Sequence, residues 1–334
     1  MTISRRSLGL GAFLALGLSA TGLPSLALAQ SAEPVKFRYL ASQGSISQHE
    51  LASELGYFNG LGIEIENVGY AQGGPASLFA LAAGSVDLGS AATSAVVNSI
   101  AGGNDFVAAY PSNGIDDKVQ SVFYVLEDSP IKSLADIAGK SIAVNTLGAH
   151  LDYTVREALH QAGLPQNAAN LIVVPGPQLE QTLRSGQVDI AALGYWQATF
   201  EGLLKEHGGV RAVFDDTDVL GEIAGGFIVL RRDFIEAHPA AARNFVEQST
   251  RAADWSRENP DEARKVLAGI LEKRGENAEL AKYWTGFGLR PGAQAIPRDL
   301  DFWIAVLERE GSLPKGKLKA ADLLFQPNAE AKSN

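Results

Sequence analysis

The chain has 334 residues, a formal net charge of −10 and no cysteine, and 46% of its residues are hydrophobic. This balance is typical of a globular protein, because a disordered chain carries fewer apolar residues. At roughly 150 residues per domain, the length predicts two domains. The excess of acidic residues argues against nucleic acid as a partner, which requires clustered Lys and Arg. The lack of cysteine excludes disulfides, thiolate metal sites and cysteine nucleophiles.

Residues 1–29 have the features of an export signal. Arg5 and Arg6 precede an apolar run from Ser7 to Leu23, and Ala27-Leu28-Ala29 supplies the small residues that a signal peptidase accepts. The run is shorter than the ~20 residues that span a membrane, which makes a permanent anchor the weaker alternative. The paired arginines leave the twin-arginine pathway and the ordinary secretory pathway open. Both pathways predict a soluble mature protein in the periplasm.

Predicted strands and helices alternate after the signal, which is the pattern of an α/β fold. Val35–Leu40 and Ile63–Val68 have the composition of strands. Helices are predicted to begin near Ser47, ending at Gly60, and after Gly73. Four later segments are also predicted to be strands, the last of them a return to the first part of the fold: Gln120–Leu126, Ser141–Asn145, Leu171–Val174 and Gly225–Leu230.

The carboxyl-terminal third is predicted to be helical. The tetrapeptide Asn259-Pro260-Asp261-Glu262 has the features of a helix start, with an asparagine cap, a proline at the first position and two acidic residues. A further helix is predicted over Pro297–Glu310, and Gly311 would end it. Residues after Pro327 are predicted to form a loose tail.

A turn pattern occurs twice in the chain. Residues Leu81–Leu88 (LAAGSVDL) match Leu183–Ile190 (LRSGQVDI) in the leucine, the glycine and the Val-Asp pair. Each glycine suits the left-handed end of a helix, and each Val-Asp pair would begin a buried strand. Two unrelated helix-to-strand turns are the alternative interpretation, but the shared spacing favours two similar lobes.

Known catalytic motifs are mostly lacking. Gly139-Lys140-Ser141 resembles the end of a phosphate-binding loop, but Leu134 occupies the place of the required glycine. The chain has no G-x-S-x-G nucleophile motif, and its five histidines form no H-x-x-x-H pair. A triad assembled from distant residues stays open as an alternative, because such triads are defined by geometry and not by sequence order.

Four polar loops follow predicted strands, at the place where open α/β sheets bind ligands. Three of them are rich in small or hydroxyl residues, which would let a ligand approach backbone N–H groups with helix dipoles behind them. The fourth offers two aromatic rings. Each serine or threonine alone is explained equally well as a helix cap, and it is the four loops together that favour a binding site. The loops are Ser42–Ser45, Ser90–Ser94, Thr146–Ala149 and Gly194–Gln197.

Several longer segments resemble one family, the substrate-binding proteins of ABC importers for taurine, alkanesulfonates, nitrate and related small molecules. The resemblance implies a type II periplasmic-binding-protein fold of class α/β, with two lobes that are each a mainly parallel sheet flanked by helices. Lobe 1 would comprise residues 30–113 and 234–334, and lobe 2 residues 114–233. The segments that carry the resemblance are Leu55–Phe58 with Gly62–Glu66, Leu81–Gly89, Ser133–Val144, Ser185–Ala192, and Arg232–Phe234 with His238-Pro239.

The ligand class follows less directly. The four loops contain no Lys or Arg, so an anion would be held by backbone N–H groups and hydroxyls, which suits a sulfonate. Tyr195 and Trp196 would stack on an aromatic ligand or simply pack beneath a lobe. An ammonium group, as in taurine, would need a carboxylate, for which Glu222 and Asp218 are candidates. The predicted ligand-binding residues are Gln43, Gly44, Ser45, Ser90, Thr93, Ser94, Thr146, Gly148, His150, Tyr195, Trp196 and Glu222; Tyr110, Ser112 and Asn113 are weaker candidates.

The resemblance implies a periplasmic receptor that captures a small organic anion between its lobes and delivers it to a membrane permease with a cytoplasmic ATPase. A sulfonate of the taurine type is the favoured ligand, and nitrate, an aromatic carboxylate or a pyrimidine remain alternatives. The receptor is expected to be a monomer without cofactor or metal. Related pyrimidine-synthesising enzymes carry a Cys-rich segment, which this chain lacks. A periplasmic hydrolase with a dispersed triad and a sensory domain are the alternatives from other classes.

Overall fold

The structure is a computed structural model that describes residues 33–116 and 118–326. Its contacts divide the chain into Met1–Glu33 and Pro34–Asn334, and every element below belongs to the second unit. The predicted export signal and the predicted tail after Pro327 lie outside the described residues.

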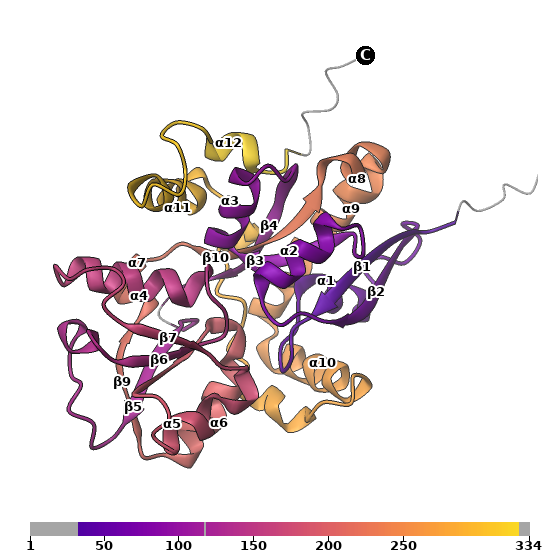
Figure 1. Cartoon of the computed structure of the whole chain (residues 1–334). Coiled ribbons are helices and arrows are strands. Elements are labelled where there is room, and N and C mark those ends of the chain that lie inside the picture. Colours follow the sequence, from indigo (N-terminus) through magenta and orange to yellow (C-terminus); the bar gives the residue numbers. More distant parts are fainter. Residues whose placement is uncertain (1–32, 117, 327–334) are drawn as a thin grey trace, which may run out of the picture. The chain divides into compact units, whose positions relative to one another are not determined.

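The first lobe contains two sheets (Figure 1). Strands β1 (Val35–Ala41) and β2 (Ile63–Tyr70) pair in parallel, and β10 (Ala224–Arg231) lies between β3 (Leu88–Ala92) and β4 (Phe106–Gly114), antiparallel to both. Helices from both ends of the chain accompany these strands. They are α1 (Gln48–Glu54), α2 (Gly74–Ala82), α3 (Thr93–Ala101), α8 (Arg232–Ala237), α9 (Pro239–Glu258), α10 (Pro260–Lys273), η4 (Ala278–Tyr283), η5 (Pro291–Ala293), α11 (Pro297–Arg309) and α12 (Ala320–Leu323).

The second lobe is formed by one continuous stretch of chain. Its five-stranded sheet has the order β7-β6-β8-β5-β9, in which β6 runs parallel to β7 and β8 while β5 runs antiparallel to β8 and β9. The strands are β5 (Val122–Leu126), β6 (Ser141–Val144), β7 (Asn170–Val173), β8 (Ile190–Leu193) and β9 (Val210–Asp215), and the helices are η1 (Leu134–Ile137), α4 (His150–Gln161), η2 (Gly176–Gln178), α5 (Leu179–Arg184), η3 (Tyr195–Gln197), α6 (Ala198–His207) and α7 (Asp216–Leu220).

The repeated turn has the same structure in both lobes. Gly84 and Gly186 each have a φ of 70°, the left-handed conformation that glycine tolerates best. The two aspartates also play the same part. The Asp87 carboxylate accepts the backbone N–H of Arg38 at 3.0 Å, and the Asp189 carboxylate accepts that of Ser141 at 2.8 Å. Each aspartate therefore ties the strand that follows it to another strand of its own lobe, β3 to β1 and β8 to β6, which agrees with the predicted pair of similar lobes.

The structure differs from the sequence-based expectations in three details. The pairing is not mainly parallel, because β10 runs antiparallel to β3 and β4, and β5 runs antiparallel to β8 and β9. The helix predicted to reach Gly60 ends at Glu54. The Asn259 side chain does not cap α10, since its amide donates to the carbonyl of Trp255 at the end of α9. Because β10 belongs to the sheet of the first lobe, we propose that the return to this lobe begins before Ala224 and not at residue 234.

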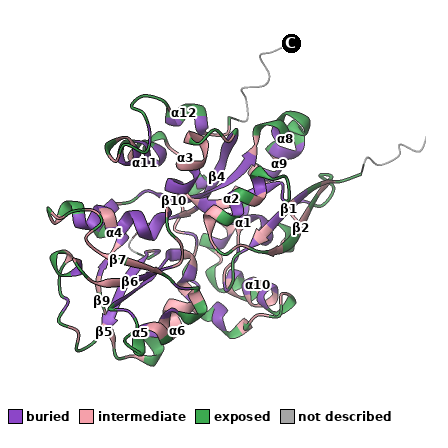
Figure 2. Ribbon diagram, in the orientation of Figure 1, coloured by how far each residue is buried: buried purple, intermediate pink, exposed green. Residues whose placement is uncertain are grey.

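The core joins the two ends of the chain. Most strands are largely buried, although β2 and β7 contain no buried residue, and the exposed residues lie on the outer helices and loops (Figure 2). Phe37 on β1 stacks on Phe245 on α9 with ring centroids 4.3 Å apart, and both side chains have an exposed fraction of 0%. The first lobe therefore depends on aromatic packing between segments that lie far apart in sequence.

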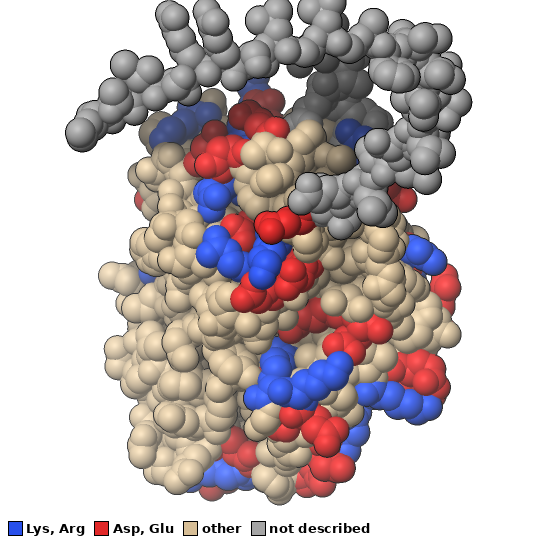
Figure 3. Space-filling view, turned by 90° about the vertical axis from the view of Figure 1, so that its right-hand side faces the viewer, with Lys and Arg blue, Asp and Glu red and all other residues tan. Residues whose placement is uncertain are grey.

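The surface carries charges of both signs. On the face that lies to the right in Figure 1, basic and acidic side chains alternate in small groups and leave a broad uncharged area (Figure 3). Lys36, for example, lies between Glu64 and Glu66, at 3.6 and 3.4 Å. No helix within residues 33–116 and 118–326 is both long and apolar enough to cross a membrane.

Candidate functional site

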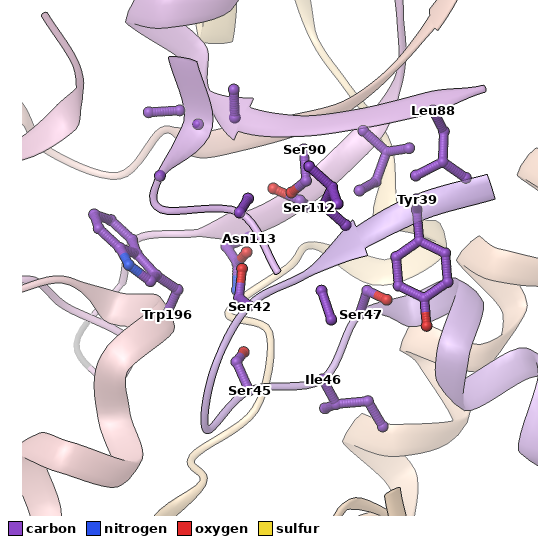
Figure 4. Close-up of a pocket in the computed structure, with 18 of the residues that line it drawn as sticks. Tyr39, Ser42, Ser45, Ile46, Ser47, Leu88, Ser90, Ser112, Asn113 and Trp196 are labelled. Carbon is purple, nitrogen blue, oxygen red and sulfur yellow. The ribbon is translucent and has the colours of Figure 1, made fainter. Parts of the chain in front are cut away.

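A cavity of about 90 Å³ is lined by residues from both lobes. The first lobe contributes the loop after β1, the start of α1, and the ends of β3 and β4. The second lobe contributes Asn145 after β6, Ala149 before α4, and Tyr195 and Trp196 in η3. Figure 4 shows Trp196 on a segment that faces Ser42, Ser45 and Asn113. The cavity therefore lies at the carboxyl ends of strands, where α/β folds bind their ligands.

The polar lining is made of hydroxyl and amide groups. No Lys or Arg is among the lining residues, and Glu50 is their one carboxylate. The polar side chains that line the cavity are those of Tyr39, Ser42, Ser45, Ser47, Gln48, His49, Glu50, Ser90, Ser112, Asn113, Asn145, Tyr195 and Trp196.

Glu50 is held by a set of donors from the first lobe. Its carboxylate accepts the hydroxyl of Tyr39 at 2.7 Å and the backbone N–H and hydroxyl of Ser47 at 2.8 and 2.7 Å. The guanidinium of Arg274 lies 3.3 Å from its Oε1 atom, and both side chains are less than a tenth exposed. The charge of Glu50 is thus balanced within the lobe, which leaves the cavity without a free counter-charge for a ligand.

His49 extends this network into the core. Burial lowers the pKa of His49 to about 4, so its imidazole is neutral near pH 7. The Ser47 hydroxyl donates to Glu50, which leaves His49 Nε2 to donate to Ser47 Oγ at 2.9 Å. His49 Nδ1 then accepts the hydroxyl of Tyr110 at 3.2 Å. Ser47 therefore presents an acceptor, and not its proton, to the cavity.

His49 makes the stability of the protein depend on pH. The ordinary pKa of 6.5 applies to the unfolded chain, whereas the folded value is about 4, so the unfolded state binds more protons between these values. We expect the free energy of unfolding to fall by up to about 3 kcal/mol as the pH drops from 6.5 to 4. In urea titrations across this range, His49→Gln should remove that part of the pH dependence, and the exposed His160→Gln should keep it. Equal slopes in wild type and His49→Gln would contradict the assignment.

Backbone N–H groups are available at two helix starts beside the cavity. Helix α2 begins at Gly74 and α3 at Thr93, and neither has a side chain that caps its N-terminus. Gly73, Gly74, Ala91 and Ala92 line the cavity. A Cβ atom on Gly74 would lie 2.8 Å from the Ala91 Cβ, so glycine is required for this close approach. Uncapped N–H groups at the positive ends of helix dipoles are suited to an anion.

The structure brings together some of the predicted site residues and separates others. Ser45, Ser90, Tyr195 and Trp196 line the cavity, as do the weaker candidates Ser112 and Asn113. Their contact with a ligand stays a prediction. The other eight do not line it. Gln43 and Glu222 are exposed, Gly44 is buried, and Thr146 is partly exposed beside Gly73. The surroundings of Thr93, Ser94, Gly148 and His150 are described below. Asp218 is exposed and does not line the cavity. Its carboxylate accepts the backbone N–H of Asp215.

Three of the predicted residues are hydrogen-bonded or buried within the protein. The hydroxyl of Thr93 donates to the carbonyl of Ala224 at 2.8 Å. Ser94 has an exposed fraction of 0%. The N–H of Gly148 donates to Asp152 at 2.8 Å. Thr93 and Gly148 are thus bonded within the fold and Ser94 is buried, which leaves fewer of these groups for a ligand than the loops alone suggest.

His150 is also held within the protein. Its Nε2 atom lies 2.6 Å from Asp216 Oδ2, and both side chains have an exposed fraction of 0%. Asp216 additionally accepts the N–H of Ser121 at 2.8 Å. Because Asp216 belongs to α7, 66 positions later in the chain, no local pattern around His150 indicates this pairing.

Sequence reasoning missed Ser47, Gln48 and Asn145 as lining residues. The sequence places Ser47 at the start of a helix, and in the structure it forms a capping box with Glu50. Gln48 donates to the carbonyl of Ser112, which places its amide against β4. Asn145 is predicted as the last residue of a strand, whereas in the structure β6 ends at Val144 and Asn145 follows it.

Comparisons with known proteins agree with this architecture. A protein of Brucella abortus that carries the name of a binding protein is 28% identical over 269 residues, which cover 80% of each chain. The periplasmic aliphatic sulphonate binding protein of Escherichia coli is 24% identical, with a TM-score of 0.68 over 89% of this chain and 93% of that one. The alkanesulfonate-binding protein of Xanthomonas axonopodis pv. citri, in complex with MOPS, is 20% identical, with a TM-score of 0.71 over 88% and 99%.

These solved structures establish the shared fold and confirm the predicted two-lobed α/β class. The chain is also matched, over residues 47–263, by the sequence pattern of the family described as NMT1/THI5 like. That match covers more than half of the chain and includes α1, most of the cavity loops and the whole second lobe. The chain therefore belongs to the NMT1/THI5-like family.

Proposed function

We propose that this protein is the periplasmic receptor of an ABC importer, and that it binds a small organic anion in the cavity between its lobes. The observation that carries the proposal is a cavity lined by both lobes, with hydroxyl and amide side chains, with the uncapped starts of α2 and α3 beside it in the first lobe, and with no cationic side chain among its lining residues. Such a lining favours reversible binding, because ligand contacts with both lobes stabilise the state in which the lobes are together. A membrane permease that recognises this state is the expected partner.

A sulfonate is the ligand class that we favour. Its negative charge is spread over three oxygen atoms and persists at any physiological pH, so dipoles and hydroxyls can bind it without a counter-charge. The names of the two solved relatives, which bind sulphonates, support this choice. Trp196 would provide a stacking surface for an aryl sulfonate. Nitrate, an aromatic carboxylate and a pyrimidine are the competing ligands.

The arrangement around Ser47 supports binding over hydrolysis. Ser47 and His49 are the cavity-lining hydroxyl and imidazole that lie within hydrogen-bond distance, at 2.9 Å. The Ser47 proton points to Glu50, however, and the lowered pKa of His49 makes its imidazole a weak base. A serine in this setting is not activated as a nucleophile.

The proposal is tested by a ligand panel on the purified mature protein. The panel contains methanesulfonate, taurine, benzenesulfonate, nitrate, benzoate and a pyrimidine, and mass spectrometry identifies small molecules released from the protein as purified. At a concentration about 100 times the Kd, a sulfonate should raise Tm by roughly 5 °C. The same sulfonate should be recovered unchanged after prolonged incubation. Its conversion to a product, or stabilisation by none of the panel anions, would refute the proposed function.

A further inference from the structure

The loop after β1 contacts the second lobe at Gly44. The flanking residues Ser42 and Ser45 line the cavity, while Gly44 is buried behind it. The N–H of Gly44 donates to Glu276 Oε2 at 2.5 Å, on the side of its own lobe. Its carbonyl accepts the hydroxyl of Thr199, on α6 of the other lobe, at 3.0 Å. One residue of the cavity loop is thus bonded in both directions, once to each lobe.

The close approach between the lobes requires glycine at this point. Gly44 has a φ of +68°, and a Cβ atom there would lie 2.7 Å from Thr199 Oγ1 and 3.1 Å from the ring of Phe200. Thr199 has an exposed fraction of 1%. Because its hydroxyl is buried, loss of the bond to Gly44 would leave a polar group without a partner.

The carboxylate that holds Gly44 is itself fixed. Glu276 Oε1 accepts the hydroxyl of Tyr70 at 3.0 Å and lies 3.3 Å from Arg274 Nε. Arg274 has a side chain that is 8% exposed, and it donates to the carbonyl of Ser45 at 2.5 Å. Two residues that follow α10 therefore hold two successive residues of the cavity loop.

The same segment continues to the second lobe. Tyr283, at the end of η4, donates its hydroxyl to Glu206 on α6 and packs against Gly202 of that helix. Lys282 lies 3.2 Å from the same Glu206 carboxylate. The chain from Arg274 to Tyr283 thus contacts the cavity loop at one end and the facing helix of the second lobe at the other.

We propose that Thr199 and Glu276 are positioning residues for ligand binding, which hold the cavity loop through Gly44. We call these three residues the clasp. The clasp couples ligand binding to contact between the lobes. A loop whose conformation is set by ligand contact at Ser42 and Ser45 also presents the Gly44 carbonyl to Thr199. Affinity then depends on residues that do not touch the ligand. The inference rests on the proposed function for the identity of the ligand. The contacts between Gly44, Thr199 and Glu276 do not depend on that function.

The distance between the lobes tests the clasp without any ligand. Because the chain has no cysteine, spin labels can be attached at Ser85→Cys and Gln187→Cys, the matching exposed positions of the repeated turn. Pulsed electron–electron double resonance of the ligand-free protein should show a longer mean distance and a broader distance distribution for Thr199→Val than for wild type. Thr199→Ser, which restores the hydroxyl, should return the wild-type distribution. The matched control is Thr182→Val, because the Thr182 hydroxyl bonds to Gln178 within its own lobe.

The affinity is measured in the same variants with the sulfonate that stabilises the wild type in the panel. Thr199→Val should weaken binding about fivefold, through faster dissociation. Glu276→Leu, which removes the acceptor on the other side of Gly44, should have the same effect and serves if Thr199→Val does not fold. Unchanged distances and affinity in these variants would overturn the clasp. A changed distance in a protein that binds no panel ligand would instead support the clasp and refute the proposed function.

Discussion

Replacing Ser90 by aspartate should weaken the binding of an anionic ligand roughly 100-fold. Ser90 lies on β3, is partly exposed, and lines the cavity on the side of the uncapped helix starts (Figure 4). At about 5 Å and an effective dielectric constant of about 20, two negative charges repel each other by about 3 kcal/mol. No Lys or Arg among the lining residues would offset the new charge. Isothermal titration calorimetry with the stabilising sulfonate measures the loss.

The matched control for this variant is Ser90→Asn, which has the size of aspartate without its charge. The difference in affinity between the two variants measures the effect of charge repulsion separately from the effect of the larger side chain. We expect Ser90→Asn to bind within about tenfold of wild type, because it keeps a hydrogen-bonding group in the cavity. If Ser90→Asp binds as tightly as Ser90→Asn, the ligand has no negative charge near β3.

Replacing Gly114 by alanine should lower the free energy of unfolding by about 3 kcal/mol or more. Gly114 ends β4, and its N–H donates to the carbonyl of Phe287 at 2.8 Å. A Cβ atom on Gly114 would lie 1.8 Å from the carbonyl oxygen of Gly288. This obstacle is backbone, so it cannot rotate away as a side chain would. Urea denaturation of the two proteins measures the difference.

A second glycine provides the control. Gly269 lies inside α10, and a Cβ atom there would have no neighbour within 4 Å. Gly269→Ala should therefore stabilise the protein by about 0.5–1 kcal/mol, since alanine favours the helix and restricts the unfolded chain. An equal loss of unfolding free energy in both variants would show that the contact between Gly114 and Gly288 is not the cause of the destabilisation.

Local patterns were sufficient for most of the elements. Val35–Leu40 and Ser141–Asn145 were recognised because buried strands are apolar and bounded by turn residues. The repeated turn was recognised because its glycine and aspartate have structural tasks within a few residues of chain. Strand direction was not accessible in the same way. The apolar run of β10 is the same whether its neighbours are parallel or antiparallel, and only the completed sheet decides.

The site was predictable to the level of loops, and not to the level of side chains. Ser45 lies at the cavity because it follows β1, as the sequence predicts, whereas Ser90, expected in a loop, lines the cavity from within β3. The involvement of His150 with Asp216, and of Thr93 with the carbonyl of Ala224, depends on partners from remote segments. Asn259 shows the same limit within a helix start, because its side chain bonds backwards to Trp255. The local sequence shows that a polar group is near the site, and tertiary contacts determine whether that group faces the cavity or bonds within the protein.

The first lobe is built from two segments that lie far apart in the sequence, and this determines the order in which the two lobes can fold. The second lobe, from β5 to α7, comes entirely from residues 122–220, so all its strands and helices are present once that stretch has been synthesised. The first lobe has to wait for β10 and for α9, whose Phe245 stacks on Phe37 of the first strand. Closing a chain segment of this length slows folding. A nascent chain that ends before α9 therefore has a finished second lobe and no ligand pocket, and ligand can assist only the last stage of folding.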